Sequence, residues 1–192
     1  MENKLIAGMR ASNEVREIFA VANREKIYNL VTAIVETLRN GNKLVIFGNG
    51  GSAADAQHMA AEFVNRFLID RPPLAALALT TDTSILTSIG NDFSFADIFV
   101  KQITALGRAG DLALGISTSG NSENVIVAVK EAGKLGMRTA ALTGGEGGRL
   151  LDMVDFGLNV PTSFTPHIQE THLWVEHIIC QLVDEKMFGE TE

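Results

Sequence analysis

The sequence predicts a single α/β domain: a flavodoxin-like parallel sheet of five strands flanked by helices, preceded by N-terminal helices. Five short apolar segments lack the alternation of a half-exposed strand, which is typical of strands buried on both faces; they lie at about 43–47, 75–80, 111–116, 138–143 and 156–160. Helical patterns fill the intervals between these segments. Strands that alternate with helices favour a parallel sheet, whose ligands bind beyond the carboxyl ends of the strands.

The chain begins with helical patterns, which we interpret as one helix over 2–21 and a second over 22–40. The second has apolar residues on one face, at helical spacing: Ile27, Leu30, Val31, Ile34, Val35 and Leu38. Gly41 follows Asn40 and is a good helix stop. We therefore divide the single domain, 1–192, into an N-terminal helical segment over 1–40 and an α/β core over 41–192.

The first strand of the core leads into a glycine-rich turn and then into a helix predicted over 53–67. Free backbone N–H groups and the helix dipole make such a turn a ready anion site. His58 and Glu62 are four residues apart in this helix, so they share one face, about one turn deeper than the anion site. An anion site with an imidazole and a carboxylate behind it indicates chemistry on a small phosphorylated molecule.

Helices are next predicted over 82–89 and 96–107, and the third strand then leads into the hydroxyl-rich turn STSGNS at 117–122, before a helix over 122–135. Hydroxyls and backbone amides can bind a phosphate monoester without Lys or Arg. We expect Ser117, Ser119 and Ser122 to bind it. Either loop alone is more often a plain strand-to-helix turn, but two loops of this kind favour ligand binding.

The last helices are predicted over 147–153 and 166–187. Gln169 and His177 lie eight residues apart in the second of them, close to one face, although spacing alone is a weak sign of a metal site because no compact zinc motif is present. The single cysteine, Cys180, excludes an intrachain disulfide and is expected to pack in the core.

Composition excludes several classes of protein. The formal net charge of −7 argues against nucleic-acid binding, which needs a basic surface. No apolar run is long enough to span a membrane, and the N-terminus does not have the pattern of a signal peptide. We therefore expect a cytoplasmic protein that binds neither nucleic acid nor membranes.

Motifs along nearly the whole chain carry a resemblance: GNGGSAADAQHMAAE, LTTDTS, IGNDF, GDLALGISTSGNSENV, ALTGGEGG and IQETHLWVEH. On these segments the chain resembles the sugar isomerase (SIS) domain family and, within it, the phosphoheptose isomerases. The resemblance implies a homotetramer that converts sedoheptulose 7-phosphate into D-glycero-D-manno-heptose 7-phosphate, which feeds the heptose of lipopolysaccharide cores and other bacterial glycans. Apolar helix residues are candidate subunit contacts: Phe19, Ile27, Val31, Trp174 and Ile178.

The resemblance also implies roles for individual residues. The catalytic acid/base pair falls on Glu62 and His177. One Zn²⁺ per subunit would be held by His58, Glu62, Gln169 and His177. The sugar phosphate would be contacted by Asn49, Gly50, Gly51, Ser52, Glu62, Asn91, Asp92, Ser117, Thr118, Ser119, Ser122 and Gln169. The stretch Thr165, Pro166 and His167 departs from the acidic–basic pair that relatives often place there.

Two alternatives stay open. A related regulator is a tetramer that binds the replication initiator DnaA without catalysis, and it shares the stretches at 52–61 and 65–67. It lacks the acid/base pair that this chain has at Glu62 and His177, so we favour the enzyme. An isomerase for another sugar phosphate, or a sugar-binding regulator, is a third possibility, against which the absence of an appended regulatory domain counts.

Overall fold

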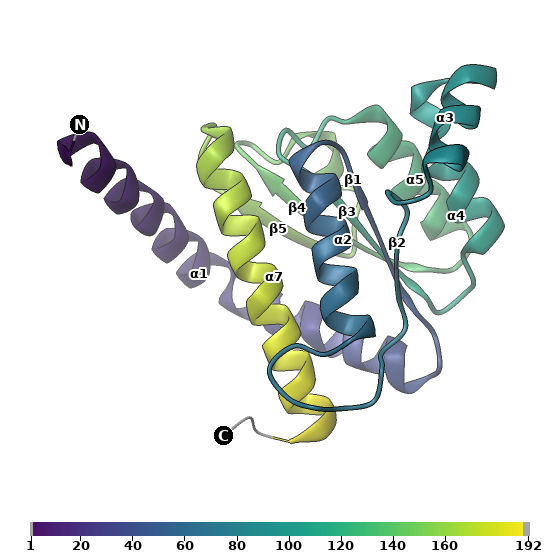
Figure 1. The fold of residues 1–192 in the computed structure, drawn as a ribbon, viewed down its shortest axis with the longest axis horizontal. Helices are drawn as coiled ribbons and strands as arrows, with labels where there is room; N and C mark the ends of the chain where they lie inside the picture. The colour runs from purple at the N-terminus through teal and green to yellow at the C-terminus, as the bar shows by residue number, and fades with distance from the viewer. Residues whose placement is uncertain (1, 190–192) are drawn as a thin grey trace.

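A computed structural model describes residues 2–189 as an α/β domain in three layers, with helices on both faces of one sheet (Figure 1). All strands are parallel and lie in the order β2-β1-β3-β4-β5. They are β1 (Leu44–Gly48), β2 (Ala76–Ala78), β3 (Leu112–Ser117), β4 (Arg138–Gly144) and β5 (Phe156–Val160). This is the flavodoxin-like order. The predicted fold class is confirmed, and each predicted strand overlaps an observed one.

The helices divide between the two faces of the sheet. One face is covered by α1 (Glu2–Arg39), α2 (Gly51–Val64) and α7 (Thr165–Phe188). The other side carries α3 (Thr83–Asp92), the 3₁₀ helix η1 (Phe95–Asp97), α4 (Val100–Leu106), α5 (Glu123–Lys134) and α6 (Gly148–Leu151). Within residues 2–189, no helix has both the length and the apolar character needed to cross a bilayer.

The prediction of two N-terminal helices is wrong, because α1 is one continuous helix of 38 residues. No glycine or proline interrupts its central part. Asn23, close to the predicted break, is buried and donates its side-chain amide to the carbonyl oxygens of Phe19 and Asn159, at 3.0 and 3.5 Å. A polar side chain that bonds one turn back along its own helix gives the chain no reason to leave that helix.

Successive strand residues point into two different apolar clusters. In β1, Leu44 and Ile46 pack with α1, α2 and α7, whereas Val45 and Phe47 pack with α4 and α5. Both clusters exclude water, so every residue of the strand is apolar and the polar–apolar alternation is lost.

Three residues that we predicted to contact another subunit are instead buried within a single chain, so this prediction is wrong for them. Phe19 and Val31 expose none of their surface and Ile27 exposes 6%, all within a single chain. Phe19 instead packs edge-on against Trp174 of α7, with ring centroids 6.4 Å apart. Their apolar face therefore belongs to the core of this chain and cannot serve another subunit.

Candidate active site

The two predicted loops lie side by side at the carboxyl ends of the strands, because β1 and β3 are parallel neighbours in the sheet. Asn49, after β1, and Asn124, in the first turn of α5, exchange two side-chain hydrogen bonds of 2.9 and 2.8 Å. This amide pair fixes the distance between the loops without adding charge. The N-termini of α2 and α5 are thereby held close together.

The glycine-rich turn leaves the start of α2 open to a ligand. Gly50 has a φ of 56°, which favours glycine, and no side chain caps the helix. The N–H groups of Ala53 and Ala54 donate to the Gly50 carbonyl, at 3.1 and 3.3 Å, so the N–H groups of Gly51 and Ser52 are the ones left for an anion. A side chain at Gly51 would collide with the amide of Gln169, so the glycine lets α7 approach this turn. Ser52 is buried beneath the turn.

The hydroxyl-rich turn gathers its side chains at the start of α5. Ser122 occupies the N-cap position but makes no capping bond, and its Oγ lies 3.0 Å from the Oγ of Ser117 instead. The Oγ of Ser119 accepts a hydrogen bond from the backbone N–H of Asn121 at 3.2 Å. The uncapped N–H groups of α5 and these hydroxyls together form an arrangement suited to phosphate oxygens.

A pocket of about 330 Å³ opens beside this turn, between the loops that follow β3 and β4 and the start of α7. Thr118, Ser119 and Ser163 are among the side chains that line it. Gly120 has a φ of 63°, and a side chain there would collide with the Gly147 carbonyl. The close approach of the two loops, which depends on this glycine, shapes the wall of a cavity large enough for a small polar ligand.

The predicted acid and base converge from two helices. The Nε2 atoms of His58 on α2 and His177 on α7 lie 2.8 Å apart, and Glu62 Oε1 lies 3.8 Å from His58 Nε2. The Glu62 side chain is 22% exposed, so it is shielded but accessible to a ligand. Phe67, which follows α2, stacks on the His177 ring with centroids 5.5 Å apart and planes 17° apart.

Burial lowers the pKa of His177, and the neighbouring His58 lowers it further, while Glu62 acts in the opposite direction. His177 is therefore a neutral imidazole at neutral pH, able to donate at one nitrogen and accept at the other.

His172, which had no functional signal in the sequence, is buried, and burial lowers its pKa to about 4. Its Nε2 donates to the Thr143 carbonyl at 3.0 Å and so joins α7 to β4.

Two carboxyl groups behind this pair escaped the sequence analysis. Burial raises the pKa of Asp55 to about 6, against the effect of His58. Burial, and then the charge of Asp55, raise the pKa of Glu176 well above its usual value, and neither Glu176 oxygen has a hydrogen-bond partner among residues 2–189. A carboxylate within an apolar helix face was the available signal. Burial therefore favours the neutral form of the Glu176 carboxyl.

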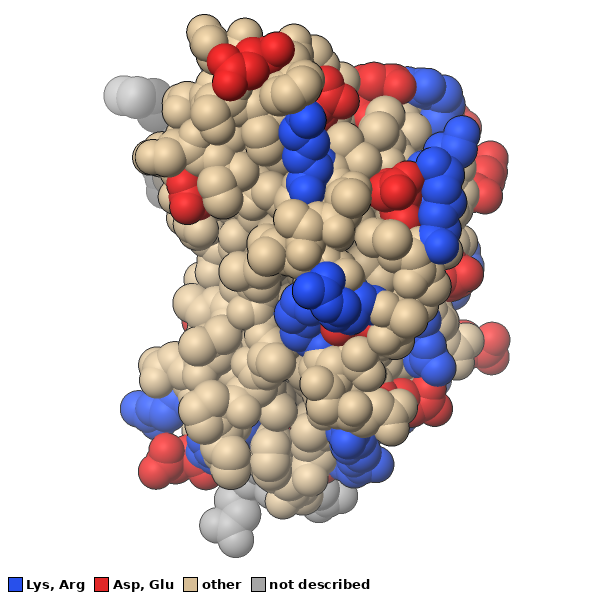
Figure 2. Space-filling view, turned by 90° about the vertical axis from the view of Figure 1, so that its right-hand side faces the viewer, with Lys and Arg blue, Asp and Glu red and all other residues tan. Residues whose placement is uncertain are grey.

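Asn91 and Asp92 are not brought to this pair within one chain. Both are exposed at the end of α3 and hydrogen-bond to each other at 2.8 Å. In Figure 1, α3 stands at the upper right, far from α7. Figure 2 shows this side of the molecule, where charges of both signs are interspersed with a wide uncharged surface.

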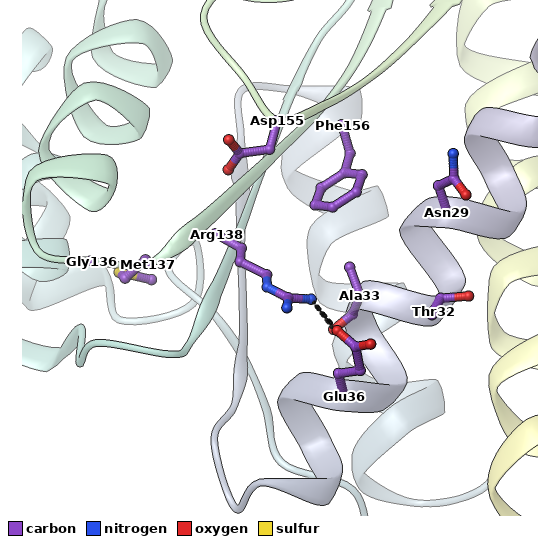
Figure 3. Close-up of a pocket in the computed structure, with 9 residues that line it drawn as sticks. All are labelled: Asn29, Thr32, Ala33, Glu36, Gly136, Met137, Arg138, Asp155 and Phe156. Carbon is purple, nitrogen blue, oxygen red and sulfur yellow. Dashed lines mark hydrogen bonds and ion pairs between the residues drawn. The ribbon is translucent and has the colours of Figure 1, made fainter.

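A second pocket, of about 610 Å³, lies at the opposite edge of the sheet, between α1 and the amino ends of β4 and β5 (Figure 3). Its charged side chains are already paired. Arg138 bonds Glu36 at 2.7 Å, and Asp155 accepts the Thr139 N–H at 2.8 Å. Parallel α/β sheets bind ligands at the carboxyl edge, so the carboxyl edge is the candidate active site.

Metal donors are present here without forming a complete site. Among the described residues, no group of three His, Cys, Asp or Glu side chains is arranged to hold an ion. The two imidazole nitrogens nevertheless face each other, and the Glu62 carboxylate lies on the same side of α2. Imidazole and carboxylate are donors that Zn²⁺ accepts, so the chemical types fit. Gln169, the fourth predicted ligand, lies over Gly51.

Comparisons with known proteins identify the family. The SIS domain model matches residues 9–144. The phosphoheptose isomerase of Nitratidesulfovibrio vulgaris is 51% identical over 175 residues, 91% of this chain and 84% of that protein. That of Clostridium acetobutylicum is 45% identical over 192 residues, 99% of this chain and 98% of the other. The structure of the Neisseria gonorrhoeae phosphoheptose isomerase matches with a TM-score of 0.91 and 44% identity, covering 96% of this chain and 98% of that one. The chain therefore belongs to the SIS domain family and, within it, to the phosphoheptose isomerases, as its motifs predicted.

Proposed function

We propose that this chain isomerises sedoheptulose 7-phosphate to D-glycero-D-manno-heptose 7-phosphate, for the heptose of lipopolysaccharide cores or other glycans. The observation that carries this function is the convergence of Glu62 and His177 from α2 and α7, together with the uncapped N-termini of α2 and α5. Relatives over nearly the full length are named as isomerases. Their names do not favour the regulator that binds DnaA.

The phosphate would bind at the hydroxyl-rich turn, through Ser117, Thr118, Ser119 and Ser122. The sugar would then extend past Asn49, Gly50, Gly51 and Gln169 toward Glu62 and His177. Since Ser52 is buried, it would contribute its backbone N–H rather than its hydroxyl. Asn91 and Asp92 remain predicted contacts.

The chemistry needs one proton moved between carbons and one between oxygens. Glu62 would take the proton from C1, so that the C1–H electrons form the C1=C2 bond of an enediol while O2 gains a proton. Glu62 would then return its proton to C2 as O1 loses its own and the C1 carbonyl forms. The neutral His177 suits the transfer between O1 and O2, because it can donate and accept at neutral pH.

A zinc ion is a further part of the proposal. His58, His177, Glu62 and Gln169 would hold it, and the facing Nε2 atoms at 2.8 Å support the assignment of the two histidines. When bound, a divalent ion polarises a carbonyl and orients the adjacent oxygens. Coordination makes a carboxylate less basic, so Glu62 would have to bind loosely to remain the base.

We also propose a homotetramer. The first turns of α1 extend beyond the sheet in Figure 1. Exposed apolar side chains lie along this helix, among them Leu5 at 71% in its first turns and Val21 at 78% near its middle. Phe93 and Phe95, at the end of α3 and just beyond it, are 64% and 65% exposed. Clusters of exposed apolar side chains on more than one element mark surfaces that bind other chains.

Glu62→Gln should lower kcat by about 10²–10⁴-fold, because the nearly isosteric change removes the base. His177→Gln should lower kcat to a similar extent. NMR spectroscopy that follows the conversion of sedoheptulose 7-phosphate measures both effects. Glu36→Gln is the matched control, since Glu36 lies at the opposite edge of the sheet. Wild-type turnover by Glu62→Gln would refute its role. A wild-type chain that binds DnaA but shows no turnover would favour the regulator.

Ser119→Ala should raise KM by about 10- to 150-fold and change kcat little, since a hydrogen bond to a charged group is worth about 1.5–3 kcal/mol. Steady-state kinetics measure both constants. Thr104→Ala is the control, because its hydroxyl bonds only within α4. An unchanged KM for Ser119→Ala would show that the phosphate does not bind to Ser119.

Removal of metal by a chelator should lower kcat, and added Zn²⁺ should restore it. When Zn²⁺ is titrated into the metal-free protein, calorimetry should measure the binding of one ion per chain. The heat of binding should disappear in His58→Ala but persist in His167→Ala. Full activity of a protein shown by elemental analysis to be metal-free would eliminate the ion from the reaction.

Light scattering at micromolar concentration should give four times the chain mass of 20.6 kDa. Val21→Glu should reduce the mass, because it places a charge on the exposed apolar surface of α1, whereas Glu25→Gln should not. A monomeric wild-type chain would contradict the tetramer.

A further inference from the structure

The connection between α2 and β2, residues 65–75, crosses α7 close to its C-terminal half (Figure 1). Near its start, Phe67 stacks on the His177 ring. Further along, Arg71 is buried, with 8% of its surface exposed. One loop thus contacts the proposed acid/base histidine and also buries a charged side chain.

The Arg71 guanidinium donates to carbonyl groups at the end of α2 and in the loop that follows it. Its Nη2 donates to the carbonyl of Glu62 at 2.8 Å, and its Nη1 donates to the carbonyl of Phe63 at 2.8 Å. The same Nη1 also reaches the carbonyls of Asn65 and Pro72, at 3.5 and 3.2 Å. The last carbonyl groups of a helix have no donor within the helix. Arg71 supplies donors to those of Glu62 and Phe63, and the Leu74 N–H also donates to Phe63, at 3.0 Å.

The remaining donor joins this end to α7. Arg71 Nε donates to Asp184 Oδ1 at 2.8 Å, and the two side chains are 2% and 1% exposed. Asp184 lies seven residues after His177, two turns along α7 on nearly the same face. A single guanidinium therefore links the main chain of Glu62, the loop that carries Phe67 and the helix that carries His177.

We propose that Arg71 is a positioning residue for the isomerisation. It fixes the end of α2 and the Phe67 loop against α7, and so sets the distance and orientation between the Glu62 carboxylate and the His177 imidazole. This role rests on the proposed function of that pair. It requires the planar fork of arginine, since the ammonium group of lysine cannot reach the same set of acceptors from one position.

The expected effect lies in kcat. A misplacement of about 1 Å between reacting groups can cost on the order of 100-fold in rate. The phosphate-binding turn at 117–122 follows another strand and makes no hydrogen bond with Arg71 in the described structure. Substrate binding should therefore survive a change at Arg71 that disturbs the chemistry.

The test compares Arg71→Lys with the wild type, assayed well below the melting temperature of each. We expect kcat to fall by at least about tenfold and KM to stay within about threefold. Lys43→Met is the matched control. Lys43 also pairs with a buried carboxylate, Asp111, at 2.5 Å, but at the amino edge of the sheet. Lys43→Met should lower the melting temperature and leave kcat unchanged.

A folded Arg71→Lys with the wild-type kcat would overturn the proposal. If Arg71→Lys does not fold, Phe67→Leu tests the same loop with Arg71 intact: a lower kcat at unchanged KM supports the proposal, and a wild-type kcat overturns it. A wild-type chain without turnover would overturn the proposed function and this role together. Equal turnover by the wild type and Arg71→Lys would overturn only the role of Arg71.

Discussion

The packing of α2 against α7 is the contact on which the candidate site depends. His58 and Glu62 lie on α2, whereas Gln169 and His177 lie on α7. Both helices cover the same face of the sheet and share one apolar cluster, to which Met59 and Val175 contribute. A rotation or shift of either helix would separate Nε2 atoms that now lie 2.8 Å apart. Because close-packed side chains resist such shifts, the core itself holds the reactive groups in place.

The sheet order provides the second half of the site. With β1 and β3 adjacent, two loops with different chemistry open at one edge, and the amide pair of Asn49 and Asn124 sets their spacing. One loop offers backbone N–H groups beside Gly50 and Gly51, and the other adds serine hydroxyls. Two adjacent loops with different binding groups suit a substrate with a phosphate at one end and a reactive carbonyl at the other. Neither the phosphate nor the carbonyl would contact the amino ends of the strands.

Sequence reasoning predicted what depends on local pattern. The buried strands follow from apolar segments, and the paired placement of His58 and Glu62 follows from a spacing of four residues. It was wrong about α1, because Asn23, near the predicted break, bonds to the Phe19 carbonyl within the helix and also to the Asn159 carbonyl of β5, a contact that the sequence does not show. It also assigned Phe19 and Val31 to a subunit contact, since an apolar face does not reveal which surface covers it. Phe67 and Arg71 could not be predicted, because their surroundings exist only once the loop after α2 lies against α7. Glu176 was missed although a carboxylate within an apolar helix face was a signal for it.

The length of α1 links the order of the chain to the proposed tetramer. A helix of 38 residues is about 57 Å long, yet side chains 3–10 are all exposed and make no part of the core. A helical end of that size has little stability of its own in water. Its order in a lone chain rests on continuity with the part of α1 that packs on the sheet. If the proposed tetramer covers Leu5 and Met9, these N-terminal turns are the segment in which folding and assembly would be most closely coupled, and their helix content would rise on assembly.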